Sequence, residues 1–295
     1  MDSEMSRYYQ ASGKVPFVGT VLMQLFGAVA AAVLGGLYAL ANWYSPRAFL
    51  TIFAVLIFGA GVGFAVNIGA KIGKVRNAGF VMLLGTATGI LAVYFAWVVY
   101  IHLAFRNMGF QDLWIWRPDF IFKTMQLFAE NATGTFTGWL LWACWVMEAG
   151  IVILLSLAIS VANDTPFCDY CNAWTKKADD VASFPLTDPA ALQGELEAER
   201  YEVLDELRKS GRPDPSNRLK AVIHSCPNCE DSDYLTISHA TVVVDSDGNE
   251  ETNDTELVKY LRIPRDVTEH LHEMGAPVSY DEDEETPKPE DEILF

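Results

Sequence analysis

The chain has 295 residues, of which 51% are hydrophobic and 20% charged, and its formal net charge is −17. Residues 1–163 hold 9 Lys and Arg against 6 Asp and Glu, whereas residues 164–295 hold 12 against 32. This asymmetry predicts two domains, each in a different solvent. The acidity of the second half argues against nucleic acid as a partner, because binding nucleic acid requires clustered Lys and Arg.

Four apolar runs are long enough to cross a bilayer, since a spanning helix needs about 20 mostly apolar residues. They cover residues 17–43, 49–70, 78–105 and 138–161. We therefore expect an α-helical integral membrane protein in which residues 17–163 form a four-helix transmembrane bundle in the lipid bilayer. Residues 1–16 precede it as a cytoplasmic N-terminal segment.

The connection between the second and third runs carries Lys71, Lys74 and Arg76 and no acidic residue. Cytoplasmic loops hold an excess of Lys and Arg, so this connection is predicted to be cytoplasmic. Alternation of the spans then places both termini in the cytoplasm. We expect a multi-pass protein of a bacterial inner membrane or a plasma membrane.

Between the third and fourth runs, Trp114 and Trp116 precede Pro118, and proline favours the first turn of a helix. The apolar positions that follow predict a helix over residues 112–130, on the side opposite to the termini. Two interpretations remain open for it. It lies in the headgroup layer, anchored by the tryptophans, or it packs on the bundle as a lid.

Small residues four positions apart recur in the spans. They are Ala28, Ala32 and Gly36 in the first run, Gly59, Gly63, Gly69 and Gly73 in or just after the second, and Gly85 and Gly89 in the third. Such residues allow the close backbone approach by which helices associate in lipid. We expect them to pack the bundle internally, with a homo-oligomer interface as the alternative.

Glu148 lies in the middle of the fourth run, and no basic residue occurs at that depth. A charged carboxylate there is costly, so we expect a neutral carboxyl that donates a hydrogen bond. The candidate acceptors are Thr86, Thr88 and Tyr94 of the third run. The functional interpretation is a proton or cation site in a transport path, and the structural one is a tie between two helices.

Two CxxC motifs place Cys168 with Cys171 and Cys226 with Cys229. Each tight turn presents two thiolates to one tetrahedral ion, which is typical of a structural zinc site. Zinc is the predicted cofactor, and iron with the same ligands is the alternative. Disulfides are disfavoured because the predicted compartment is reducing. Cys144, in the fourth run, is expected to be a packing residue.

The residues around the motifs predict a small fold. A helical insert is expected over 189–210, strands over 218–224, 234–244 and 257–263, and a short helix over 264–275. Residues 164–275 should therefore form a small α+β cytoplasmic domain that resembles a zinc ribbon, in which the metal compensates for a small core. Residues 276–295 form an acidic tail that is predicted to be disordered.

The sequence contains no Gly-rich phosphate loop, GxSxG elbow or HExxH motif, so an enzyme is not expected. We expect a membrane scaffold or assembly protein that presents its acidic zinc-binding domain to a cytoplasmic protein or to copies of itself. The alternative is a small oligomeric proton or cation channel or transporter. It would use Glu148 and be regulated through the cytoplasmic domain.

Overall fold

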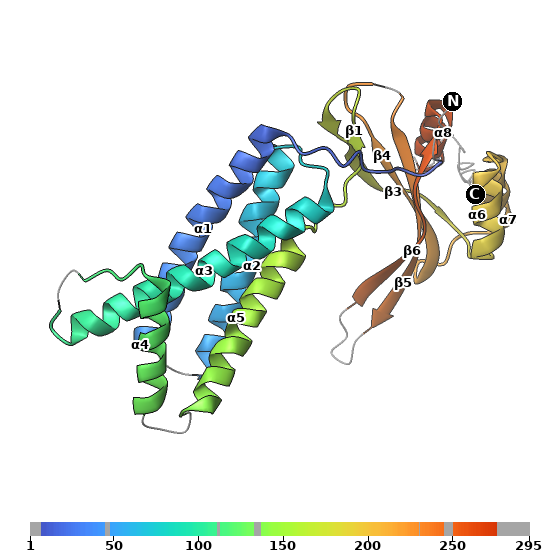
Figure 1. Cartoon of the computed structure of the whole chain (residues 1–295). Coiled ribbons are helices and arrows are strands. Elements are labelled where there is room, and N and C mark those ends of the chain that lie inside the picture. Colours follow the sequence, from blue (N-terminus) through green and yellow to red (C-terminus); the bar gives the residue numbers. More distant parts are fainter. Residues whose placement is uncertain are drawn as a thin grey trace, which may run out of the picture. The chain divides into compact units, whose positions relative to one another are not determined.

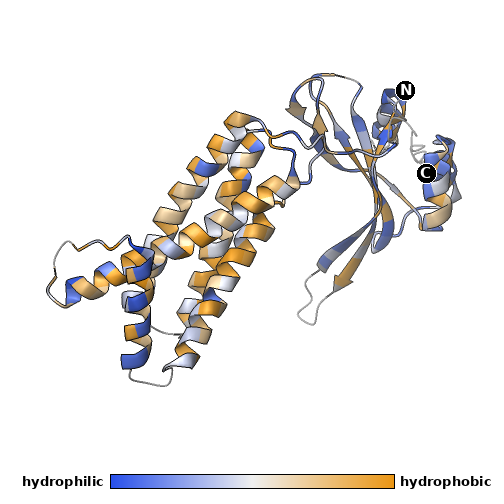
Figure 2. Ribbon diagram, viewed as in Figure 1, coloured by the Kyte–Doolittle hydropathy of each residue, from blue (hydrophilic) through white to orange (hydrophobic). Residues whose placement is uncertain are grey.

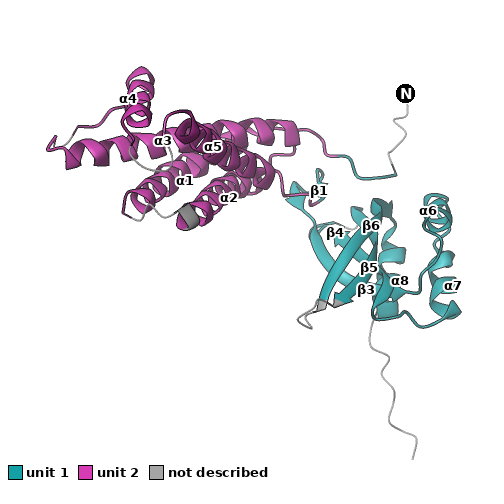
Figure 3. Cartoon of the chain, turned by 90° about the horizontal axis from the view of Figure 1, so that it is seen from below, with its two compact units in different colours: residues 1–10, 166–295 teal, residues 11–165 magenta. Residues whose placement is uncertain are grey.

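The computed structural model describes residues 7–44, 48–110, 113–132, 137–229, 231–244 and 250–275 (Figure 1). The chain divides into two compact units (Figure 3). Unit 1 comprises Met1–Gln10 and Pro166–Phe295, and unit 2 comprises Ala11–Thr165. The acidic tail predicted to be disordered, residues 276–295, lies outside the described residues.

Unit 2 contains four helices that are long and apolar enough to span a membrane, as predicted. They are α1 (Phe17–Tyr44), α2 (Ala48–Ile72), α3 (Ala78–Asn107) and α5 (Trp139–Ser160). Hydrophobic residues predominate along all four (Figure 2). Helix α1 packs against α2 and α3, and α5 packs against the same two helices. Large apolar side chains such as Leu83 and Leu154 are exposed, which is the pattern of a membrane protein.

Glycines bring the helices of unit 2 into close contact. A Cβ added at Gly63 of α2 would lie 2.7 Å from the carbonyl oxygen of Ser156 on α5. Gly69 lies against Met23 of α1, and a Cβ added at Gly89 of α3 would lie 3.2 Å from the Ser156 Cβ. Because only a residue without a side chain fits at such distances, these glycines pack the bundle from inside.

The small residues that pack α1 are not the expected ones. The buried positions of this helix include Gly27, Ala31 and Gly35, whereas Ala28 and Ala32 are exposed. The prediction is therefore displaced by one residue. Helix α1 is apolar on every side, so its composition alone does not distinguish the inward face from the outward one.

Helix α4 (Pro118–Asn131) begins at the proline, later than the predicted position 112. Its buried residues include Ile121, which packs with Val98 and Ile101 of α3. One face of α4 thus lies on α3, and this supports the interpretation of the segment as a lid on the bundle.

Unit 1 contains a small antiparallel sheet in the order β3–β4–β5–β6. Its strands are β3 (Lys176–Phe184), β4 (Asn217–Ser225), β5 (Asp233–Val244) and β6 (Glu250–Ile263), and a separate hairpin pairs β1 (Phe167–Cys168) with β2 (Ala173–Trp174). The helices are α6 (Pro189–Glu197), α7 (Glu202–Ser210) and α8 (Arg265–Gly275). The segments predicted as strands are β4, β5 and part of β6, whereas β1, β2 and β3 were not predicted.

One face of this sheet forms the core of unit 1. Alternate residues of β4 and β5, such as Leu219 and Leu235, pack with leucines of all three helices. The predicted helical insert is present but consists of two helices, because Glu199 adopts a positive φ of 62° between α6 and α7.

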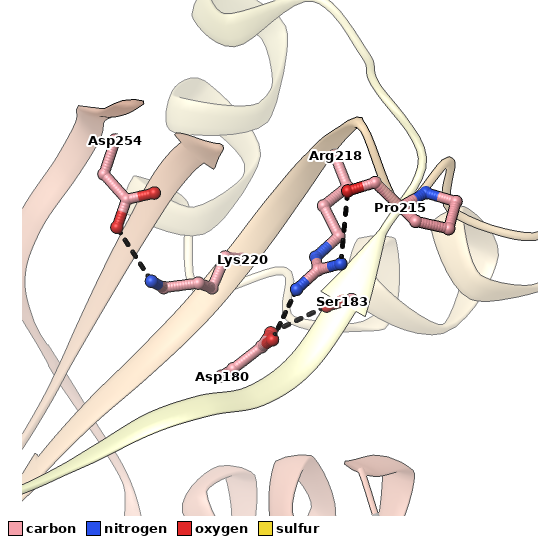
Figure 4. A network of polar contacts seen from close by, with 6 residues as sticks. All are labelled: Asp180, Ser183, Pro215, Arg218, Lys220 and Asp254. Atoms are coloured by element: carbon pink, nitrogen blue, oxygen red, sulfur yellow. Dashed lines mark hydrogen bonds and ion pairs between the residues drawn. The ribbon is translucent and has the colours of Figure 1, made fainter. Parts of the chain in front are cut away.

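The intervening residues of β4 point to the other face, since side chains alternate along a strand. There Arg218 Nη2 pairs with Asp180 at 2.7 Å, and Lys220 Nζ pairs with Asp254 at 2.7 Å (Figure 4). The Ser183 hydroxyl also donates to Asp180. Such partly exposed pairs contribute little stability, and farther along β4 on this face Val222 and His224 are buried.

Residues near the N-terminus belong to unit 1. The Tyr9 amide donates to the Tyr260 carbonyl at 2.9 Å, and the Arg262 amide donates to the Arg7 carbonyl at 2.8 Å. The Tyr8 hydroxyl donates to Glu197 at 2.6 Å. Part of the segment expected to be separate, residues 1–16, therefore extends the sheet at the edge of β6.

Candidate metal centre and intramembrane pocket

The four cysteines of the two CxxC motifs come together at one place in unit 1. Cys168 ends β1 and Cys171 lies in the turn that follows it, whereas Cys226 and Cys229 lie in the connection from β4 to β5. Their sulfur atoms all lie within 4.8 Å of one another. The Cys168 and Cys229 sulfurs are 3.7 Å apart. The four cysteines could hold one metal ion.

Both turns have local supports. The β1–β2 turn includes Asn172 with a φ of 52°, a conformation that asparagine tolerates better than most residues. The Phe167 and Trp174 rings pack edge to face across this hairpin, with centroids 4.8 Å apart. In the second turn, the Cys226 amide donates to the Ser232 carbonyl at 3.2 Å. The ligand positions are therefore built into two hairpins.

The thiols differ in how readily they ionise. Burial raises the pKa of Cys168, but hydrogen bonds from the Ser232 hydroxyl and the Cys171 amide outweigh it and lower the pKa to about 7. Burial, followed by the hydrogen bonds to Cys229 and Cys226, raises the pKa of Cys171. Without a cation the cluster thus favours ionisation of Cys168 and disfavours that of Cys171, and a divalent cation would stabilise the thiolate form of both.

The fifth cysteine, Cys144, lies apart from this cluster. It is part of α5 and lines a pocket in unit 2 together with Glu148. The sequence had suggested only a packing role for it, and nothing in its surroundings assigns it a ligand.

Glu148 has a different partner from the ones expected. The Tyr38 hydroxyl on α1 donates to Glu148 Oε2 at 2.9 Å. The Thr86 and Thr88 hydroxyls instead donate to carbonyls within α3, at 2.9 and 2.7 Å. Tyr94 donates to a carbonyl in the segment before α4. The hydrogen bond that the structure describes for Glu148 thus joins α5 to α1, while these three hydroxyls donate to backbone carbonyls.

Depth along the helices did not single out Tyr38. Tyr38 lies six residues from the end of α1, Glu148 nine residues from the start of α5, and Tyr94 13 residues from the end of α3. Tyr38 and Tyr94 are therefore at similar differences in depth from Glu148. The rotation of each helix decides which of them it contacts, and rotation is not encoded in spacing alone.

The pocket around Glu148 has a volume of about 590 Å³ and is lined by α1, α2, α3 and α5. Its walls are mostly apolar, and five of the lining residues are aromatic. The Tyr38 and Phe58 rings stack at 5.1 Å between centroids, and Trp97 meets Trp145 edge to face at 4.9 Å. No Lys, Arg or His belongs to the described lining residues.

A short polar chain continues from the Glu148 contact along the pocket wall. The Asn42 amide donates to the Tyr38 carbonyl at 3.1 Å, and the Thr51 hydroxyl donates to Asn42 Oδ1 at 2.8 Å. This chain joins α1 to α2 beside the carboxyl. The described residues thus give the molecule two candidate sites, a thiol cluster in unit 1 and a pocket with one carboxyl in unit 2. No protein-family model, curated protein or solved structure matches this chain.

Proposed function

We propose that this chain is a membrane-anchored scaffold, in which the helix bundle carries a zinc-stabilised cytoplasmic domain that binds another protein. The observation that carries the proposal is the convergence of four thiols, all within 4.8 Å of one another. Sulfurs that bind zinc tetrahedrally at about 2.3 Å lie about 3.8 Å apart. The Cys168–Cys229 distance of 3.7 Å agrees with this spacing.

The placement of the ligands supports a zinc-ribbon-like arrangement. Two hairpin turns contribute two thiols each, one after β1 and one between β4 and β5. An ion held in this way would join two segments that are distant in the chain. Its role is structural, because four thiolates fill a tetrahedral shell and leave no open position for a substrate. Iron with the same ligands is the alternative metal.

The hydrogen bonds of residues 7–9 support the proposed topology. Residues 7–9 are joined to β6 of unit 1 by these bonds, which supports a topology with the N-terminal segment and the C-terminal domain on one side of the membrane, as four spans require. In this topology the connection between α2 and α3, with Lys71, Lys74 and Arg76, would lie on the same side. Since cytoplasmic loops are enriched in Lys and Arg, we assign this side to the cytoplasm.

The charge of the C-terminal half supports a role in protein binding. It holds 12 Lys and Arg against 32 Asp and Glu. An acidic surface attracts a basic partner from solution and repels other acidic proteins. We therefore propose a partner with a basic contact surface, or a second copy of the chain joined through its bundle.

The metal can be tested on the full chain purified in detergent. Elemental analysis should find roughly one zinc per chain, as a tetrathiolate site requires. Cys226→Ser and Cys229→Ser should each lose most of it, while Cys144→Ser, the matched control outside the cluster, should retain it. Full zinc content in the two cluster variants, or neither zinc nor iron in the wild type, would contradict the assignment.

The scaffold role requires a separate test. The full chain is captured with its partners from native membranes after mild crosslinking, and each candidate is then rebound to the purified chain in lipid nanodiscs. We expect binding that weakens with salt and is lost in Cys226→Ser. Recovery of a monomer alone, with no partner that rebinds, argues against the role.

A second candidate function is transport of protons or cations through the bundle. The pocket around Glu148 favours it, because an acid at this depth is usually functional. The close glycine contacts in the other half of the bundle oppose a continuous path within one chain. Ion flux into liposomes, compared between the wild type and Glu148→Gln, tests it, and equal flux in both would exclude a role for this carboxyl.

A further inference from the structure

The two halves of the bundle are packed differently. In one half, glycines of α2 and α3 lie directly against neighbouring backbones, as at Gly63 and Gly89. The segments that line the pocket in the other half, residues 38–42, 51–58, 93–100 and 141–152, contain a single glycine, Gly150, and a Cβ added there would meet nothing within 4 Å. Large rings hold the helices apart there, so the cavity of about 590 Å³ follows from the sequence of these segments.

The pocket walls present aromatic rings from several helices. Tyr38 comes from α1, Phe58 from α2, Trp97 and Tyr100 from α3, and Trp145 from α5. The faces of such rings carry negative potential and attract cations, most strongly for tryptophan. A cation with an apolar exterior would gain both from this attraction and from apolar contact.

Glu148 supplies the acidic group at this site. Its Oε2 accepts the hydrogen bond of the Tyr38 hydroxyl, which orients the carboxyl from α1. The described lining includes no Lys, Arg or His. An ionised carboxylate in this position therefore has no protein cation to balance it, and a bound cation would supply the missing charge.

We propose that this pocket binds a hydrophobic organic cation, with the aromatic rings around its apolar groups and Glu148 as its counter-charge. The volume of about 590 Å³ lies within the range of small-molecule sites. A small inorganic cation fits the lining less well, because such ions require several oxygen ligands. An organic anion is opposed by Glu148. The proposal concerns equilibrium binding and depends on neither the scaffold role nor transport.

The test uses the full chain in nanodiscs of zwitterionic lipid and radiolabelled tetraphenylphosphonium as the probe, with empty nanodiscs to correct for partition into lipid. We expect saturable binding to the wild type. In Glu148→Gln the affinity should fall about 10-fold to 100-fold, the usual effect of losing an interaction with a charged group. Glu130→Gln removes an exposed carboxyl of α4 and should leave the affinity unchanged.

Two further measurements keep the test decisive if Glu148→Gln folds poorly. Tyr38→Phe retains the ring but removes the hydrogen bond that orients Glu148, and it should weaken binding of the probe by about 2-fold to 10-fold, the usual effect of losing one hydrogen bond. Neutral triphenylphosphine oxide should fail to displace the probe from wild-type protein. The proposal would be overturned if the wild type showed no saturable binding or if a folded Glu148→Gln bound the probe with the same affinity. It would also be overturned if the neutral compound displaced the probe, because the pocket would then be a site for neutral apolar molecules.

Discussion

The two units differ in how many of their large apolar side chains they leave on the surface. Unit 1 encloses large residues such as Leu235 and Ile237, both 0% exposed, in the manner of a water-soluble domain. Unit 2 buries small residues such as Ala31, also 0% exposed, while Leu83 on its surface is 65% exposed. Unit 2 also buries large residues such as Phe58 and Ile101, so the contrast lies in the many large apolar residues that it leaves exposed.

The difference follows from the solvent that each unit faces. In water, removing apolar surface is the main source of stability, so the largest side chains are most valuable inside. Lipid tails are as apolar as leucine, and helices there gain from close packing and polar contacts. Unit 1 is small and would gain from a metal at its four cysteines as well as from its core, whereas unit 2 depends on close contact between helix backbones.

Removing the metal is expected to have the largest effect, and on one unit only. Structural zinc contributes on the order of 10 kcal/mol, comparable to the whole stability of a typical domain. Chelation, or Cys229→Ser, should therefore unfold unit 1, with rapid hydrogen exchange of the β4 and β5 amides, while the helices of unit 2 remain protected. Cys144→Ser is the control. Protected β4 and β5 amides in metal-free protein would show that the apolar core alone is sufficient.

A matched leucine substitution measures the next largest effect. Leu235→Ala in the core of unit 1 should lower the free energy of unfolding by about 2–5 kcal/mol. Leu83→Ala on the membrane surface of unit 2 should change it by less than about 0.5 kcal/mol, since the leucine exchanges one apolar neighbour for another. Denaturant unfolding of unit 1 and mixed-micelle unfolding of unit 2 provide the two values. If both substitutions lowered the free energy of unfolding equally, buried and lipid-facing leucines would contribute alike and the two units would not differ in this way.

The same contrast explains which features were predictable from the sequence. A spanning helix must satisfy its backbone hydrogen bonds internally and be long enough to cross the bilayer, so hydropathy located all four helices. The rotation of each helix was not accessible, because apolar residues surround it. This is why the buried stripe at Gly27 and Ala31 was placed one residue away.

The two candidate sites differ in the same respect. The CxxC spacing is local, so the four cysteines that come together in unit 1 were identified without a structure. The Tyr38–Glu148 contact depends on the rotation of α1 and α5, and it was missed. Strand β3 was also missed, because it is bulged, with Asp180 at a positive φ of 50°, and alternates poorly. The pairing of Tyr9 with Tyr260 joins the two ends of the chain, which no local pattern reveals.

Glycine substitutions test the packing of unit 2 with a smaller effect. A Cβ at Gly63 would lie 2.7 Å from the Ser156 carbonyl oxygen and 3.0 Å from the Ile159 Cβ. Gly63→Ala should therefore destabilise the bundle by about 1–3 kcal/mol, the range for overpacking. Gly150→Ala meets nothing within 4 Å and should be neutral or slightly stabilising in mixed-micelle unfolding. Similar stability of both variants would mean that close backbone contact is not what holds α2 to α5.

The smallest expected effect concerns the contribution of a single side-chain hydrogen bond, which should be similar in the two units. The Ser156 hydroxyl donates to the Gly85 carbonyl at 2.9 Å in unit 2, and the Thr175 hydroxyl donates to the Pro166 carbonyl at 2.9 Å in unit 1. Ser156→Ala should cost about 0.6 kcal/mol, a typical value between membrane helices. Thr175→Val should cost about 0.5–1.5 kcal/mol, the usual range in water. If unfolding measurements gave a loss several kcal/mol larger for Ser156→Ala than for Thr175→Val, the two units would also differ in the strength of their polar contacts. Similar losses would mean that the units differ only in how they bury apolar side chains.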